Sequence, residues 1–213
     1  MNSKESWLSK MKDNKTLSLF IDTATKVLAV GALFGDKTLV SKPMDSKKAL
    51  EQTNLAIEEL GKELGFSFRD VDNFYCLLGP GSNTGIRLGL TIPKTVLAFN
   101  PAIHLYGIET LKLFLAKDKN NLAALSDRSG NLFVGHYKDG QYTFDKINKS
   151  NLDSLDKTRK IYIEEGDTFA EEELSDFNVQ RISVINQMID NRDQFEDFTD
   201  NDDNYLPIYS QAI

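Results

Sequence analysis

The sequence predicts an α/β protein in which a mixed β-sheet is flanked by helices and is followed by a smaller, less regular C-terminal part. Two observations predict this class. Short apolar segments with the alternation or continuity of strands are interspersed with longer segments whose apolar residues recur every three or four positions. The composition, with 40% hydrophobic and 27% charged residues among 213, is that of a globular protein. The chain is therefore long enough for one full domain with an appendage.

The N-terminal segment predicts an extension followed by three antiparallel strands. Residues 1–15 are mostly polar, so we expect them to form an extension outside the fold. In residues 17–21 the side chains Leu17, Leu19 and Ile21 alternate with their neighbours, and residues 27–34 are almost continuously apolar. This pattern predicts two strands joined by a polar turn. The turn residues Gly35-Asp36 lead into a third predicted strand, residues 38–40.

The next segment predicts two helices on either side of a buried strand. From Ser46 the pattern changes to helical spacing, and Gly65 is a typical residue to end such a helix. Residues 74–78 are uninterrupted apolar residues, as in a strand that is covered on both faces. They lead into the glycine-rich segment Gly79–Gly85, after which a second helix begins. The residues that this spacing places on one face of the first helix are Leu50, Thr53, Ile57, Leu60 and Leu64.

The middle of the chain predicts shorter elements. We expect a strand at 103–106 and a helix at 108–116. Further strands are expected at 122–125, 132–137 and 141–144, with Asp139-Gly140 as the hairpin turn between the last two.

The last third is less regular. Short strands are expected at 160–163 and 181–185, and the acidic segment 190–204 predicts a solvated loop. Residues 205–209 are expected to dock back on the body. We therefore expect an N-terminal lobe, 16–118, and a smaller C-terminal lobe, 119–213. The order of the predicted strands and helices is typical of ribonuclease H-like folds of the actin-like ATPase superfamily.

The charge balance and the cysteine content exclude several classes. Twenty-five basic against 32 acidic side chains give a net charge of −7, which works against binding a polyanion, so strong nucleic-acid binding by this chain alone is not expected. The single cysteine, Cys76, lies in an apolar run and is expected to be a core residue. No apolar stretch approaches the roughly 20 residues that span a bilayer, and we expect a cytoplasmic protein.

A glycine-rich loop is the first candidate site. Its position between a strand and a helix would present backbone N–H groups to a phosphate, although its spacing matches neither the Rossmann nor the Walker pattern. Asp22 ends the first strand in a place that resembles the first phosphate hairpin of actin-like ATPases. The alternatives are ordinary turns, with a helix cap at Ser82 or Thr84. The residues of this possible vestigial phosphate loop are Asp22, Gly79, Gly81, Ser82, Asn83 and Thr84.

The second predicted helix carries two apolar stripes, and it is the second candidate site. A helix on a sheet needs one stripe, so the other must meet a neighbouring helix of this chain or a partner subunit. The glycines four residues apart on one flank would allow another helix to approach closely. Pro93 should bend this helix or remove one of its hydrogen bonds. The candidate interface residues are Gly85, Leu88, Gly89, Ile92 and Val96.

No residue pattern supports catalysis or metal binding. His104 and His136 are the only histidines and do not have the spacing of a zinc motif, so both are expected to be structural. No serine stands in a nucleophile elbow. We therefore expect no catalytic residue, no metal and no cofactor.

Three segments resemble the TsaB family, formerly YeaZ. They are residues 19–25, residues 78–90, and Asp127-Arg128 with the following residues 131–134. The resemblance runs from Leu17 to about Tyr137, and the glycine-rich segment is its most specific part. Asn83 and Pro93 depart from the family pattern.

The resemblance implies an actin-like, non-catalytic subunit that lacks the metal-binding histidines of its catalytic sister, TsaD. It implies a heterodimer with TsaD, cooperation with the ATPase TsaE, and a role in N6-threonylcarbamoyladenosine (t6A) modification of tRNA at position 37, with tRNA bound only through the complex. A homodimer through the same surface is a further implication. The alternatives are an actin-like ATPase or phosphotransferase that uses the Gly79–Gly85 loop and, less favoured, a peptidase.

Overall fold

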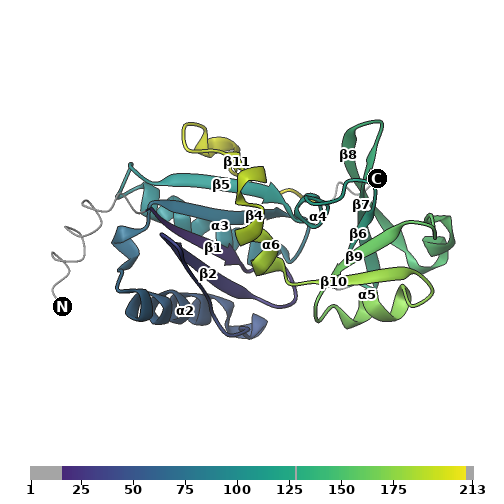
Figure 1. The fold of residues 1–213 in the computed structure, drawn as a ribbon, viewed down its shortest axis with the longest axis horizontal. Helices are drawn as coiled ribbons and strands as arrows, with labels where there is room; N and C mark the ends of the chain where they lie inside the picture. Colours follow the sequence, from purple (N-terminus) through teal and green to yellow (C-terminus); the bar gives the residue numbers. More distant parts are fainter. Residues whose placement is uncertain (1–15, 128, 210–213) are drawn as a thin grey trace.

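The computed structural model describes residues 16–127 and 129–209, in two lobes that are each built on a β-sheet (Figure 1). The first lobe has a six-stranded sheet in the order β11-β5-β4-β1-β2-β3, and the second has a five-stranded sheet in the order β10-β9-β6-β7-β8. Both sheets mix parallel and antiparallel pairs. The predicted extension, residues 1–15, lies outside the described residues.

The first sheet begins as the predicted antiparallel meander. Strand β1 is buried along its whole length because it lies in the middle of the sheet, between β2 and β4. Strands β4 and β5 then add in parallel, which places their carboxyl ends at the same edge as the end of β1. The strands are β1 (Leu17–Asp22), β2 (Ala29–Phe34), β3 (Lys37–Val40), β4 (Asn73–Gly79), β5 (His104–Glu109) and β11 (Glu196–Asp197).

Helices cover both faces of this sheet. Helix α3 (Asn83–Leu97) contacts β4, and helix α6 (Val184–Asp190) contacts β1 and β2 from the opposite face (Figure 1). Helix α2 (Ala49–Leu64) packs on β2 and ends at Gly65, which has the left-handed conformation that favours glycine there. Of the residues predicted on one face of this helix, Thr53, Ile57 and Leu60 are buried, whereas Leu50, in the first turn, is 60% exposed.

The second lobe contains the predicted hairpin. Asp139 and Gly140 both have positive φ, as a tight hairpin turn requires, and the strand that follows them extends beyond the predicted 141–144. The elements are β6 (Leu122–Ser126), β7 (Asn131–Lys138), β8 (Gln141–Asn148), β9 (Lys160–Glu164), α5 (Thr168–Glu173) and β10 (Asn178–Ile182). A separate apolar core lies between this sheet and α5.

Three predicted elements differ in the structure. The helix expected at 108–116 is shorter, α4 (Thr110–Phe114), because β5 continues to Glu109. The strand expected at 181–185 lies three residues earlier, as β10 (Asn178–Ile182), and residues from Val184 onward belong to α6. The solvated loop expected at 190–204 is also wrong, since Phe195 and Phe198 are buried there.

The end of the chain returns to the first lobe. Helix α6 and strand β11 both pack there, although their residues fall within the expected range 119–213. Residues 205–209 dock on the same lobe: Tyr205 is fully buried and the Ile208 N–H donates to the Leu78 carbonyl at 2.7 Å. Short 3₁₀ turns complete the fold: η1 (Ser46–Lys48), η2 (Phe68–Asp70), η3 (Lys149–Ser154), η4 (Arg192–Gln194) and η5 (Asp202–Asn204). No helix of the described ranges is long and apolar enough to cross a membrane.

Candidate functional site

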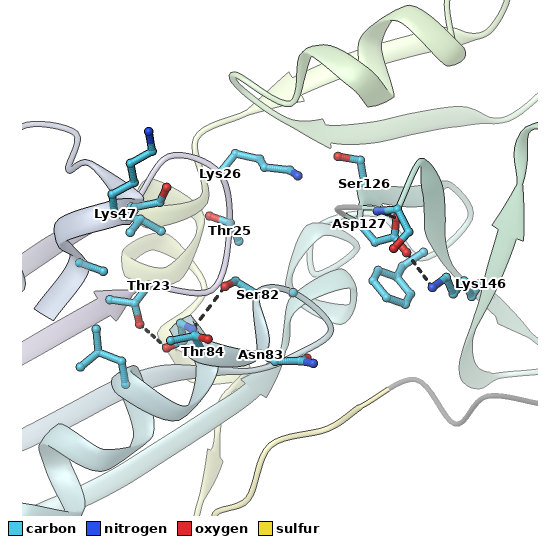
Figure 2. A pocket seen from close by; sticks show the side chains of 18 residues that line it. Thr23, Thr25, Lys26, Lys47, Ser82, Asn83, Thr84, Ser126, Asp127 and Lys146 are labelled. Carbon is cyan, nitrogen blue, oxygen red and sulfur yellow. Dashed lines mark hydrogen bonds and ion pairs between the residues drawn. The ribbon is translucent and has the colours of Figure 1, made fainter.

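A cleft of about 770 Å³ lies between the two lobes. Its first wall is the turn between β1 and β2 together with the start of α3. Its second wall is the β6–β7 hairpin, and Figure 2 shows Ser126 and Asp127 across the cleft from Lys26 and Ser82. Lys47, just before α2, also lines it.

Asp22 does not face this cleft, because its carboxylate folds back into the β1–β2 turn. The carboxylate is fully buried and accepts the N–H groups of Ala24 (3.0 Å) and Thr25 (3.2 Å) and the Thr25 hydroxyl (2.5 Å). Burial raises the pKa of Asp22 to about 6, although these hydrogen bonds oppose the shift. Asp22 therefore shapes the turn rather than lining the cleft.

Glu164 is a site residue that the sequence pattern does not reveal. It ends β9 in the second lobe, yet its buried carboxylate accepts the N–H groups of Lys26 (2.8 Å) and Val27 (2.5 Å) in the first lobe. Burial and the neighbouring Asp22 raise the pKa of Glu164 to about 7. The only local signal is a glutamate directly after an apolar strand, and nothing in the sequence indicates a partner 137 residues away.

The glycine-rich loop is in part a structural turn and in part a wall of the cleft. Gly79 has a φ of +111° and packs against the carbonyl of Ile208, so it faces the C-terminal segment. A Cβ on Gly81 would meet the Ala24 carbonyl oxygen at 2.5 Å, which leaves room for no other residue without movement.

The start of α3 carries the other residues of the loop. Ser82 caps the helix, since its hydroxyl accepts the Gly85 N–H at 3.3 Å. Ser82, Asn83 and Thr84 line the cleft, as does Gly81.

The candidate interface residues on α3 fall into two groups. Gly85 and Gly89 are buried, and the close approach that they permit is made by Thr23 of the same chain, whose hydroxyl donates to the Gly85 carbonyl at 2.7 Å. Leu88, Ile92 and Val96 are partly exposed.

Further large apolar side chains on α2 and just after α3 are exposed. Leu55 on α2 is 49% exposed, and Phe99, just beyond α3, is 87% exposed. Leu50 joins them, as described above. Large apolar side chains that are exposed on a helix are candidates for contact with another protein.

The β6–β7 hairpin is held by Asp127. Its carboxylate accepts the N–H groups of Ser129 (2.7 Å) and Asn131 (2.9 Å) and pairs with Lys146 at 2.6 Å. Partial burial opposes ionisation, but the Lys146 ammonium and these N–H groups outweigh it and lower the pKa of Asp127 to about 2. Asp127 thus stays ionised and bound to these N–H groups and to Lys146. Arg128 lies outside the described residues.

The two histidines lie in different sheets. His104 begins β5 and its ring lies 3.4 Å from the Thr199 hydroxyl, whereas His136 is on β7. They do not form a metal site together. Within residues 16–127 and 129–209, no group of three or more His, Cys, Asp or Glu side chains is placed to hold a metal ion.

Comparison with known proteins identifies the fold. The structure matches YeaZ from Pseudomonas aeruginosa with a TM-score of 0.65 and 13% sequence identity, covering 91% of this chain and 99% of that one. A crystal structure described as an uncharacterized protein with similarity to peptidase YEAZ, also from Pseudomonas aeruginosa, matches with a TM-score of 0.67 and 13% identity over 92% of this chain and 100% of that one. The predicted fold class, a ribonuclease H-like mixed α/β architecture, is confirmed.

Sequence comparisons identify the family. An uncharacterized MG208 homolog from Mycoplasma pneumoniae is 34% identical over 98 residues, which cover 45% of this chain and 50% of that protein. The chain thus matches about half the length of this relative. The family described as "TsaD: tRNA N6-adenosine threonylcarbamoyltransferase" matches residues 43–195. Because that match spans most of the molecule, the chain belongs to this family, and its fold is that of the YeaZ structures.

Proposed function

We propose that this chain is a non-catalytic subunit that binds a TsaD-type catalytic subunit and supports t6A modification of tRNA. The family match supports the pathway. The observation that carries the accessory role is the exposed apolar surface on α2 and α3. We define it as the α2–α3 face: Leu50, Leu55, Leu88, Ile92 and Val96.

The α2–α3 face has the properties of a partner surface. Ala49 of α2 and Leu88 of α3 line the same cleft, so both helices border the space between the lobes. Burying three such side chains would contribute roughly 5 kcal/mol before the cost of association. This is enough for a real contribution to binding, and further contacts would be needed for tight assembly.

The acidic groups near the cleft favour a supporting role over catalysis. Asp22 and Glu164 are buried and hold the β1–β2 turn, and Asp127 holds its own hairpin with Lys146. Each carboxylate is used in a structural contact of the fold. In the proposed complex the catalytic groups come from the TsaD-type subunit, tRNA binds through the assembly, and a TsaE-type ATPase acts with it.

Charge substitutions on the α2–α3 face test the proposal. Leu55→Asp should abolish the complex with a TsaD-type protein, measured as complex mass by light scattering after gel filtration, because it places a charge where apolar contact is needed. Because Leu55 is half exposed, the variant should remain folded, and circular dichroism checks this. Val40→Asp, at a 39% exposed site on the edge strand β3, is the matched control and should leave the complex intact.

The outcome also separates a heterodimer from a homodimer. Complex formation by Leu55→Asp at wild-type affinity would contradict the proposal. If the isolated wild-type chain is a dimer and Leu55→Asp is a monomer, the same face also pairs two copies. Gly89 is unsuitable for this test, because it is buried against Thr23.

The alternative function is nucleotide binding in the interlobe cleft. Its support is the size of the cleft and the exposed lysines Lys26 and Lys47 that line it beside the start of α3. Calorimetry with Mg-ATP on the isolated chain distinguishes the two functions. Binding with turnover in the absence of a partner would favour the ATPase, and no turnover is expected from an accessory subunit.

A further inference from the structure

The turn between β1 and β2 is hydrogen-bonded to residues of both lobes. We call residues 22–27 the junction turn. From the second lobe, Glu164 accepts the N–H groups of Lys26 and Val27 at 2.8 and 2.5 Å. From within the first lobe, the Ser82 N–H donates to the Ala24 carbonyl at 2.7 Å. The junction turn therefore connects the second lobe to the start of α3.

Glu164 has a like-charged neighbour on the junction turn. Asp22 and Glu164 are 0% and 1% exposed, and the Thr25 side chain hydrogen-bonds to the Asp22 carboxylate at 2.5 Å and also interacts with Glu164. Gly166, two residues after Glu164, is so close to Val27 that a Cβ would lie 2.8 Å from its side chain. The two lobes are thus in close contact around this carboxyl pair.

Few other titratable groups face the pair. On β4, the buried Cys76 thiol lies near Asp22, and the Tyr205 hydroxyl adjoins that thiol. Lys26 is exposed on the cleft side. Among the described residues, no cation is paired with either carboxyl group, so the two depend on hydrogen bonds and on a proton.

Two carboxylates in a water-poor site repel each other strongly when both are ionised. The pKa of Asp22 is raised to about 6 by burial, and the pKa of Glu164 is raised to about 7 by burial and by Asp22. Because the folded chain holds these protons more tightly than an unfolded chain, the contribution of the pair to stability is complete below the ordinary values of 3.8 and 4.5. It is lost as the pH rises through about 6 and about 7.

We propose that Asp22 and Glu164 form a proton-controlled latch between the two lobes. While the pair retains a proton, Glu164 holds the junction turn and the lobes stay joined at this edge of the cleft. When the last proton leaves, repulsion between the two carboxylates weakens the grip of Glu164 on Lys26 and Val27, and the cleft loosens. The latch is a property of the fold and does not depend on the proposed partner.

Amide hydrogen exchange at Lys26 and Val27 measures directly how firmly Glu164 holds these two N–H groups. Protection factors, corrected for the intrinsic pH dependence of exchange, should fall about tenfold for these two amides between pH 6 and pH 8.5. The Ala124 amide, inside β6 of the second lobe, should not change over the same range and serves as the internal reference. Equal behaviour of the junction turn and this reference would overturn the proposal.

The variant Asp22→Asn tests whether repulsion between the two carboxylates causes the loss of protection. Its amide oxygen can accept the N–H groups of Ala24 and Thr25, and its NH₂ can donate to the Thr25 hydroxyl, so the turn keeps its hydrogen bonds without the like charge. Protection at pH 8.5 should then equal protection at pH 6. A wild-type pH dependence in this variant would rule the latch out.

Two further variants serve as a control and as a substitute. Asp167→Asn changes another buried carboxyl of the second lobe, one that accepts hydrogen bonds from Ser126 and Ala170, and it should retain the wild-type pH dependence at the junction turn. If Asp22→Asn does not fold, Glu164→Gln replaces it. That variant should show weaker protection of Lys26 and Val27 at every pH and no dependence on pH, and a persistent dependence would contradict the proposal.

Discussion

The thiol of Cys76 donates a hydrogen bond to the carbonyl oxygen of Gly89, with 3.3 Å between sulfur and oxygen. Gly89 stands four residues before Pro93, which has no N–H to donate to that carbonyl. Burial raises the pKa of Cys76 to about 12, so the thiol keeps its proton. A side chain from β4 thus supplies the bond that the proline removes, and α3 continues from Asn83 to Leu97.

Cys76→Ala should lower the free energy of unfolding by about 2 kcal/mol, because it removes buried sulfur and leaves a buried carbonyl without a donor. Urea denaturation measures the loss. In the Pro93→Ala background the restored N–H of residue 93 can serve Gly89, so the same change should cost about 1 kcal/mol less. Strictly additive losses would show that the thiol does not replace the missing helix bond.

Substitutions at Gly85 and Gly89 should differ in their dependence on Thr23. Gly85→Ala should cost about 3 kcal/mol or more, since its Cβ would collide with the backbone carbonyl of Thr23. Gly89→Ala should cost about 1 kcal/mol, because its Cβ would lie 2.9 Å from the Thr23 hydroxyl, a side-chain atom. Thermal and urea denaturation measure both.

The control is the same pair of substitutions in a Thr23→Ala background. Removing the hydroxyl should relieve Gly89→Ala and leave Gly85→Ala as damaging as before, because the carbonyl remains. Equal relief at both positions would mean that the packing of Thr23 against α3 differs from the one described.

Periodicity was sufficient for the elements in which one local signal dominates. The continuous run of β4, the helical spacing of α2 ending at Gly65, and the Asp139-Gly140 turn each identify an element without reference to the rest of the fold. The same reasoning missed α6, although its buried residues have helical spacing: Val184, Ile185, Met188 and Ile189. Because the residues before them have the pattern of a strand, the predicted strand was extended into the helix.

Contacts between distant segments were not accessible from the sequence. The acidic segment after Asp190 looked solvated because carboxylates outnumber aliphatic residues, but Phe195 and Phe198 are enough to anchor it to the first sheet. Glu164 could not be assigned, because its partners are backbone N–H groups, which any residue provides. The glycines of α3 were recognised as a close-contact flank, whereas the identity of the contacting group, Thr23, required the fold.

The hairpin at the second wall of the cleft should lose stability in acid. The pKa of Asp127 is lowered to about 2, so its contribution is present above the ordinary value of 3.8 and is lost as the pH falls toward 2. Asp127→Asn should cost about 1 kcal/mol at pH 7, a figure discounted for solvent screening, and less at pH 3. Urea denaturation at the two pH values measures the difference, and a loss that does not depend on pH would contradict this assignment.

The docked C-terminal segment contains two tyrosines whose hydroxyl groups should contribute unequally. The Tyr205 hydroxyl is buried and donates to the Tyr106 carbonyl at 3.2 Å, and it adjoins the Cys76 thiol. Tyr205→Phe leaves that carbonyl without its donor, so it should lower the free energy of unfolding by about 1 kcal/mol. Tyr209 is 40% exposed and its hydroxyl accepts from the Arg87 Nε at 2.8 Å, where water can replace it. Tyr209→Phe should therefore change stability by less than about 0.5 kcal/mol. Urea denaturation of the two variants, which lose the same single oxygen, makes the comparison, and equal losses would show that the segment is held by its exposed end as firmly as by its buried one.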